Sequence, residues 1–213
     1  LEDLEVAYER SRGSETGFRY AQLLAVSLQN DNRADEAIEV LSTAFSEIPE
    51  TYAEIKDGIQ LLQILIAGLD SSLGQNAAKS LAIEGSDLKL RRIALQNLVS
   101  EGLNGPDGIK QIMRETLDEI IATSQGHPMT AEALYYRSID GFQNEDHTRL
   151  EDDGKRIVNL YPDSEYNQGM LTLLASSAWQ RNRFRTAASF LTQLKSRFAD
   201  KLDVDRLNIL IAD

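Results

Sequence analysis

The residues best suited to metal or acid–base chemistry are two histidines, His127 and His147, twenty positions apart in the chain. Imidazole is a common metal ligand, but neither histidine has a second ligand at the spacing that a metal site requires. His147 lies in an acidic segment, residues 144–149, that alternates oxygen-bearing side chains as a calcium loop does. Arg149 stands where such a loop needs glycine. We interpret both histidines as turn or surface residues, with calcium binding as the alternative for 144–149.

The glycine-rich segment 102–108 could in principle bind phosphate, because glycine-rich loops present backbone N–H groups. No Lys-Ser or Lys-Thr pair follows it and Pro106 removes a donor, so a turn between helices is favoured. Carboxylates are plentiful within 115–119 and 151–153, but an acid–base pair needs an apolar pocket to separate its pKa values. We expect these acids on polar helix faces. The sequence therefore predicts no catalytic residue, no metal, no cofactor and no enzymatic activity.

The composition of the chain excludes several classes of partner. Its 213 residues include 34 acidic and 22 basic side chains, a net charge of −12, and no cysteine. Disulfides, thiolate metal sites and a cysteine nucleophile are thereby excluded. Nucleic acids and anionic membrane surfaces attract basic proteins, so neither is expected as a partner. The longest apolar run, 59–69, is too short to cross a bilayer, and we predict no direct membrane insertion.

The charge is distributed unevenly along the chain. The first 70 residues contain 14 acidic and 5 basic side chains, whereas a local basic zone follows residue 180. Solvated helix faces explain both features most simply. The alternative is a docking surface that attracts an oppositely charged partner.

Apolar side chains recur at helical spacing along nearly the whole chain. With only four prolines and thirteen glycines, an all-β fold with its many turns is unsupported, and we predict an all-α protein. The segments 70–76 and 102–108 are expected to be loops. Helices are predicted over residues 1–11, 18–28, 34–48, 52–69, 77–83, 86–101, 109–121, 130–142, 148–161, 165–180, 183–198 and 203–212.

Two of these helix pairs carry a residue pattern that resembles the tetratricopeptide repeat, a 34-residue helical hairpin. Its small residues let two helices cross closely, and its large residues fill the space around the crossing. In residues 18–51 the matching positions are Leu24, Ala25, Ala37, Leu41, Ala44 and Pro49, although Ala21 and Leu28 stand where the family has large aromatics. In residues 168–201 they are Leu174, Ala175, Phe184, Ala187, Leu191 and Leu194.

The segments AEALYYRSIDGF, NLYPDSEY and KSRFADKL are similar to the bacterial envelope branch of that family. This branch includes outer-membrane assembly lipoproteins and proteins of the cell-division coordinator type. The resemblance implies protein–protein binding in the bacterial periplasm or at the outer membrane, with the cytoplasm as the alternative. Because the chain begins at Leu1 and its last predicted helix, 203–212, has no polar cap, we expect a fragment of a longer protein.

The resemblance also implies a binding face, because the first helix of each tetratricopeptide hairpin lines the concave side of the repeat. The implied partner-binding residues are Arg19, Gln22, Val26, Gln29, Tyr135, Ser138, Phe142, Thr172, Ser176, Trp179 and Arg183. Aromatic and arginine side chains suit the binding of a peptide segment. The competing interpretation is that Tyr135, Phe142 and Trp179 pack between repeats, as aromatics at helical spacing usually do.

Taken together, these observations predict a single domain over 1–213, a right-handed α-α superhelix of about five helical hairpins. Tetratricopeptide-like units at 18–51 and 130–201 flank degenerate helical repeats at 52–127. The predicted function is a non-enzymatic scaffold that binds a peptide or partner protein on its concave helical face. The alternatives are a helical, non-catalytic domain of a larger envelope enzyme, such as a lytic transglycosylase, and an architectural module that self-associates.

Overall fold

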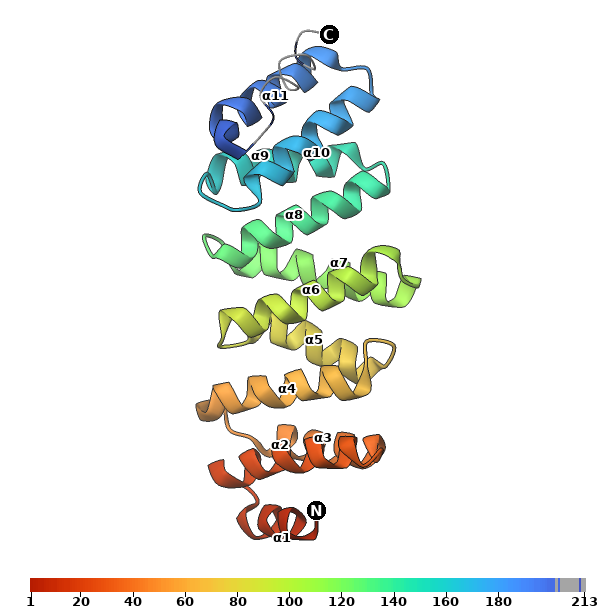
Figure 1. Cartoon of the computed structure of the whole chain (residues 1–213), viewed down its shortest axis with the longest axis vertical. Helices are drawn as coiled ribbons and strands as arrows, with labels where there is room; N and C mark the ends of the chain where they lie inside the picture. Colours follow the sequence, from red (N-terminus) through yellow and green to blue (C-terminus); the bar gives the residue numbers. More distant parts are fainter. Residues whose placement is uncertain (202, 204–210, 212–213) are drawn as a thin grey trace. The chain divides into compact units, whose positions relative to one another are not determined.

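The structure is a computed structural model that describes residues 1–201, 203 and 211 (Figure 1). All regular elements in this part of the chain are helical, which confirms the predicted all-α class. None of these helices is both long and apolar enough to cross a membrane. The helices are α1 (Glu2–Ser11), α2 (Glu15–Asn30), α3 (Ala34–Glu47), α4 (Ala53–Ala67), α5 (Ser72–Glu84), α6 (Leu88–Asn104), α7 (Asp107–Thr123), α8 (Pro128–Gln143), α9 (His147–Leu160), α10 (Asn167–Gln180) and α11 (Phe184–Phe198), with short 3-10 turns at Glu50–Tyr52 and Ala199–Lys201.

The chain divides into two compact units, Leu1–Thr116 and Leu117–Asp213, and the division falls inside α7. In the first unit, each helix from α1 to α5 packs on the next one along the chain (Figure 1). In addition, α2 contacts α4 and α4 contacts α6, so these three helices form one layer. Packing between consecutive helices is what a chain of amphipathic helices joined by short turns produces.

The pair α2–α3 forms as its sequence predicts. The apolar stripe of α2 is buried at Phe18, Leu24 and Leu28, and Ala37 and Leu41 of α3 are fully buried against it. Ser14 caps α2 by accepting a hydrogen bond from the Gly17 N–H at 3.1 Å. At the turn between the helices, Asn32 adopts a φ of +61°, a left-handed conformation that asparagine tolerates better than most residues.

The structure corrects the predicted loop at 70–76. Helix α5 begins at Ser72, five residues before the predicted start at residue 77. The cause is a cap, because the Ser71 hydroxyl accepts a hydrogen bond from the Gly74 N–H at 3.1 Å. Gly74 is required here, since a Cβ at this position would lie 1.9 Å from the Gly68 carbonyl oxygen.

The second predicted loop, 102–108, is also shorter than expected. Helix α6 continues to Asn104 and α7 begins at Asp107. Gly102 lies inside α6 at a close approach to α7, where a Cβ would come within 2.7 Å of the Met113 Cβ. The helical spacing of Ile93 with Leu90 and Leu98 predicts an inward position, but this side chain is 42% exposed.

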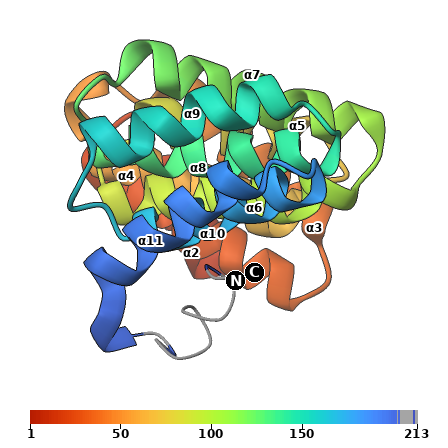
Figure 2. The ribbon, with the colours of Figure 1, turned by 90° about the horizontal axis from the view of Figure 1, so that it is seen from above.

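In the second unit, α8 packs on α9, α9 on α10 and α10 on α11, and α8 also contacts α10. Figure 2 shows α9 and α10 running side by side. Helix α8 begins at Pro128, two residues earlier than predicted, with the proline in its first turn and His127 as its cap. The helix predicted over 203–212 lies almost entirely outside the described residues.

The inner face of α9 differs from the expectation that Asp153 lies on a polar face. The spacing of Leu150 and Ile157 also predicts an apolar stripe that Asp153 and Gly154 interrupt. Both residues are buried together with Leu150 and Ile157. Asp153 is paired with Arg137 of α8, and Gly154 lies against Leu174 of α10. A charged and a glycine residue therefore belong to the packed face, since each has a specific partner on a neighbouring helix.

Candidate functional site

The most exposed aromatic residues of the described chain lie together at the turn between α10 and α11. Trp179 is 41% exposed and Phe184 is 48% exposed. Their ring centroids are 5.1 Å apart and the ring planes meet edge to face at 77°. Large apolar side chains left in solvent at one place are typical of a surface that another molecule covers.

The backbone of the intervening turn fixes this pair in place. The Asn182 N–H donates to the Trp179 carbonyl and the Arg183 N–H donates to the Ala178 carbonyl, both at 2.9 Å. Asn182 adopts a φ of +58°, which reverses the chain within a few residues. The two aromatic residues are thus held at the ends of two rigid helices, a placement that lowers the entropy lost on binding.

Two arginines of the same turn are paired with α9. Arg181 Nη1 and Arg183 Nη1 both donate to Glu151 Oε1, Arg181 at 2.8 Å. Burial raises the pKa of Glu151, but the charges and hydrogen bonds of Arg183 and Arg181 outweigh it and hold that pKa below its ordinary value. This ion-pair cluster ties the turn to α9 and places positive charge beside Trp179.

The other predicted residues of α10 lie on the same helix face as Trp179. Thr172 and Ser176 are exposed and precede Trp179 by seven and three positions, which is helical spacing. The Thr172 hydroxyl donates to the Gln168 carbonyl of its own helix at 2.9 Å. The exposed face of α10 therefore ends on its one large aromatic residue.

The predicted residues of α8 are less accessible. Ser138 is fully buried and donates to the Leu134 carbonyl at 2.8 Å, so it is no part of an exposed face. Phe142 is half-buried. Tyr135 is also half-buried and stacks on Tyr166 with the ring centroids 5.1 Å apart. For Tyr135 the packing interpretation fits better than direct contact with a partner.

Tyr166 is held by a buried carboxylate that the sequence did not single out. Burial raises the pKa of Tyr166 well above its ordinary value, and the charge and hydrogen bond of the adjacent Glu132 raise it further. Glu132 is fully buried, and Gly169 leaves room for this cluster, since a Cβ there would lie 2.7 Å from the Tyr135 hydroxyl. The cluster of Glu132, Tyr135 and Tyr166 joins α8 to α10, and its carboxylate and hydroxyl groups lie inside the second unit.

In the first unit, the predicted residues of α2 lie mostly in solvent. Arg19 and Gln29 are exposed, and Arg19 pairs with Glu15 of its own helix at 3.0 Å. Val26 is 43% exposed, and its neighbour Leu23, which the sequence did not single out, is 54% exposed. Gln22 instead serves packing, because its Nε2 donates to the Ile55 carbonyl of α4 at 3.1 Å.

The histidines and the acidic segment 144–149 serve local structure. His127 Nδ1 accepts a hydrogen bond from the Met129 N–H at 3.2 Å, and His147 Nδ1 lies 3.3 Å from the Ser177 hydroxyl. Asp146 caps α9 by accepting from the Arg149 N–H at 3.1 Å. Among the described residues, no three His, Cys, Asp or Glu side chains are placed to share a metal ion.

Phe184 is the main residue of this surface that sequence reasoning missed. The repeat pattern assigns it to a packing position, whereas its ring is exposed against Trp179. The signal that could have found it is its position at the start of α11, immediately after a turn, where the preceding helix covers little of a side chain. Comparison with protein-family models, with curated proteins and with solved structures found no match for this chain.

Proposed function

We propose that this chain is a scaffold that binds a segment of a partner protein, with the Trp179–Phe184 pair as its anchor. The exposure of two adjoining aromatic rings on a rigid helical turn carries the proposal. Tryptophan and tyrosine contribute much of the binding energy of protein interfaces, because a large ring excludes much water at little entropic cost. Covering the exposed 41% of Trp179 and 48% of Phe184 would contribute roughly 1 kcal/mol each.

The proposed architecture is a tetratricopeptide-like, right-handed superhelix built from the hairpins α2–α3, α4–α5, α6–α7, α8–α9 and α10–α11. Contacts between first helices support it, because α2 meets α4, α4 meets α6 and α8 meets α10. In such repeats the first helices line the binding face. Thr172, Ser176 and Trp179 would then belong to that face, with Arg183 at its edge.

The residue resemblances suggest a partner in the bacterial envelope, either in the periplasm or at the outer membrane. A partner segment with an apolar side chain for the ring pair and an acidic group near Arg181 or Arg183 fits this surface best. The exposed rings would also suit association of the chain with itself, which sedimentation at several concentrations distinguishes from binding of a different protein.

The test compares Trp179→Ala and Phe184→Ala with Leu160→Ala, a matched control because Leu160 is 66% exposed in the same unit. A partner captured from the source organism is purified, and its affinity is measured by calorimetry alongside the melting temperature of each variant. We expect each aromatic variant to lose about 2 kcal/mol of binding free energy, roughly thirtyfold in affinity, with its melting unchanged. Full affinity in a folded Trp179→Ala variant would reject the proposal.

A further inference from the structure

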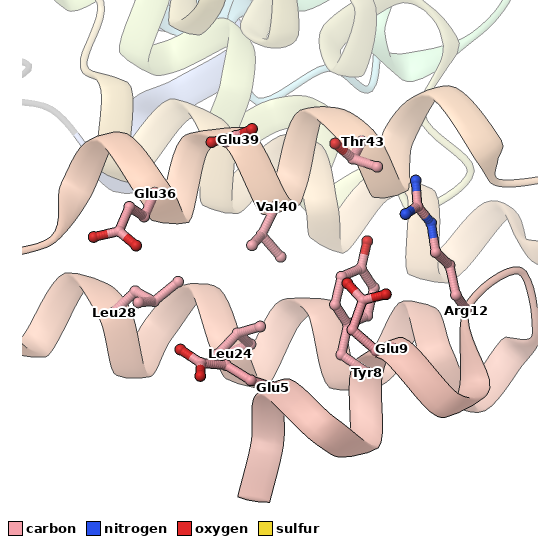
Figure 3. Close-up of a pocket in the computed structure, with 10 residues that line it drawn as sticks. All are labelled: Glu5, Tyr8, Glu9, Arg12, Leu24, Leu28, Glu36, Glu39, Val40 and Thr43. Atoms are coloured by element: carbon pink, nitrogen blue, oxygen red, sulfur yellow. The ribbon is translucent and has the colours of Figure 1, made fainter. Parts of the chain in front are cut away.

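A second surface stands apart from the aromatic pair, in the first unit. A cavity of about 410 Å³ opens between α1 and α3 above α2 (Figure 3). Four glutamates line it, Glu5 and Glu9 from α1 and Glu36 and Glu39 from α3. Figure 3 shows Glu5 and Glu9 on α1, Glu36 extending from α3 toward α1, and Glu39 at the outer edge of α3.

The negative charge of this cavity is only partly balanced. Arg33 pairs with Glu36 at 2.6 Å and approaches Glu5 at 3.9 Å. Arg12 lines the cavity but is committed to Glu47, to which both its Nε and Nη2 donate. In the part of the chain that the structure describes, Glu9 and Glu39 have no cation within 4 Å. An excess of negative charge therefore remains at the mouth of the cavity.

An unpaired polar atom lies inside the same cavity. Tyr8 is 5% exposed, and its hydroxyl is buried without a hydrogen-bond partner among the described residues. Its ring lies between α1 and α3 with the hydroxyl directed toward α3 (Figure 3). A buried hydroxyl normally has a partner, because leaving it unpaired after removal from water is costly. This one can accept a hydrogen bond from a donor that enters the cavity.

The floor of the cavity is apolar. Leu24 and Leu28 of α2 are buried at 3% and 2% exposure, and the half-buried Val40 of α3 adjoins them. An occupant therefore meets the aliphatic side chain of Val40, with Leu24 and Leu28 beneath it, and carboxylates at the rim. That combination matches a side chain with a hydrocarbon stem and a cationic head.

The arrangement suits an organic cation better than a metal ion. In the described part of the chain, no set of three or more acidic, histidine or cysteine side chains converges closely enough to bind one ion. The glutamates are instead spread along two helices, which suits a head group with several donors. A guanidinium has five N–H donors in a fixed plane and can serve more than one carboxylate together with the Tyr8 oxygen.

We propose that this cavity binds an arginine side chain presented by an apolar segment of a partner protein. The guanidinium donates to the Glu9 and Glu39 carboxylates and to the Tyr8 hydroxyl, and the stem lies against Val40. The site does not depend on the Trp179–Phe184 pair, so either proposal can fail without the other.

The test titrates the whole ¹⁵N-labelled chain with the peptide acetyl-Ala-Leu-Arg-Leu-Ala-amide and follows the amide signals of Tyr8, Glu9, Glu39 and Val40. Two matched peptides carry citrulline or alanine in place of arginine, and citrulline keeps the shape while losing the charge. We expect saturable shifts with the arginine peptide, about tenfold weaker binding with citrulline, and weaker binding at 200 mM than at 20 mM NaCl.

Variants connect this binding to the cavity. Glu9→Gln with Glu39→Gln should weaken the arginine peptide by about tenfold, and Tyr8→Phe by roughly threefold to tenfold. Glu84→Gln with Glu101→Gln, an equal charge change on exposed residues of α5 and α6, should leave the affinity unchanged.

Three results would overturn the proposal. The first is the absence of shifts at the four amides, and the second is equal affinity for the arginine and citrulline peptides. The third is an affinity for free arginine amide or spermidine that equals that of the peptide, because the site would then bind a small cation and not a protein segment.

Discussion

Arg137 of α8 holds the buried carboxylate of Asp153 of α9 through two parallel hydrogen bonds, from Nε at 2.7 Å and from Nη2 at 2.6 Å. Asp153 has a side-chain exposure of 3%, and the remaining donor Nη1 bonds Asp118 at 2.6 Å. Burial lowers the pKa of Arg137, but hydrogen bonds to Asp153 and Asp118 outweigh this effect and raise it above its ordinary value. The guanidinium thus links three helices, α7, α8 and α9.

The Arg137–Asp153 ion pair allows the energetic coupling between α8 and α9 to be measured. Arg137→Met alone should cost about 3–5 kcal/mol of unfolding free energy, because it leaves the Asp153 carboxylate buried without its bidentate partner. Asp153→Leu should also destabilise, although Arg137 keeps its bond to Asp118. The double variant should cost less than either single one. Urea denaturation of the four proteins measures the coupling, with Asp152→Ala as an exposed neighbour that changes little. Additive losses would show that the two residues act independently.

The stability of the turn beside Trp179 should depend on pH through Glu151. The folded-state pKa of Glu151 lies below its ordinary value of 4.5, so its contribution is present above that value and is lost as the pH falls through the folded-state pKa. Glu151→Gln should therefore be less stable than the original chain at pH 7, by no more than about 1 kcal/mol. The two proteins should converge at acid pH in thermal melts. A constant difference at every pH would contradict this role.

Two glycines should respond oppositely to alanine. At Gly154 a Cβ would lie 2.9 Å from both terminal carbons of Leu174, so Gly154→Ala should destabilise by about 1–3 kcal/mol. At Gly108, near the start of α7, a Cβ would meet nothing within 4 Å, and Gly108→Ala should stabilise by up to about 1 kcal/mol. Chemical denaturation of both variants decides this. Equal effects would mean that α9 and α10 do not approach closely at Gly154.

Removing the Tyr8 hydroxyl should leave folding intact. Since that hydroxyl is buried and unpaired, Tyr8→Phe should be neutral or should stabilise the chain by up to about 1 kcal/mol. Tyr20→Phe, at a half-buried tyrosine in the same unit, is the matched control. Destabilisation of Tyr8→Phe by more than 1 kcal/mol would reveal an internal partner for this hydroxyl and remove one support of the arginine site.

The helices and most of their buried faces could be predicted because helical spacing is a local property of the sequence. Phe18, Leu24 and Leu41 illustrate this, since their burial follows from their own neighbours along the chain. The start of α5 could not be predicted. The Ser71 cap begins the helix inside a glycine-containing segment that is typical of a loop. Local signals of this kind fix the existence of a helix better than its ends.

The buried carboxylates could not be predicted, because their partners come from distant segments. Asp57 accepts hydrogen bonds from the Ser86 and Asp87 N–H groups at 2.8 and 3.1 Å, almost thirty positions away. Asp153 depends on Arg137 in the same way. The acidic cavity was visible only as an excess of acids in the first 70 residues, since its shape requires α1 to lie beside α3. Trp179 could be singled out because it is the only tryptophan, whereas the exposure of Phe184 beside it was not predicted.

The most direct test of the proposed scaffold uses Trp179 itself, whose indole is the only one in the chain and is 41% exposed. Its fluorescence is measured with increasing acrylamide, first for the chain alone and then with a purified, tryptophan-free segment of the captured partner. If the partner covers the Trp179–Phe184 pair, the emission shifts to shorter wavelength and quenching by acrylamide falls several-fold at saturation. Saturated binding with unchanged emission and unchanged quenching would show that the partner binds elsewhere, and the central claim would be wrong.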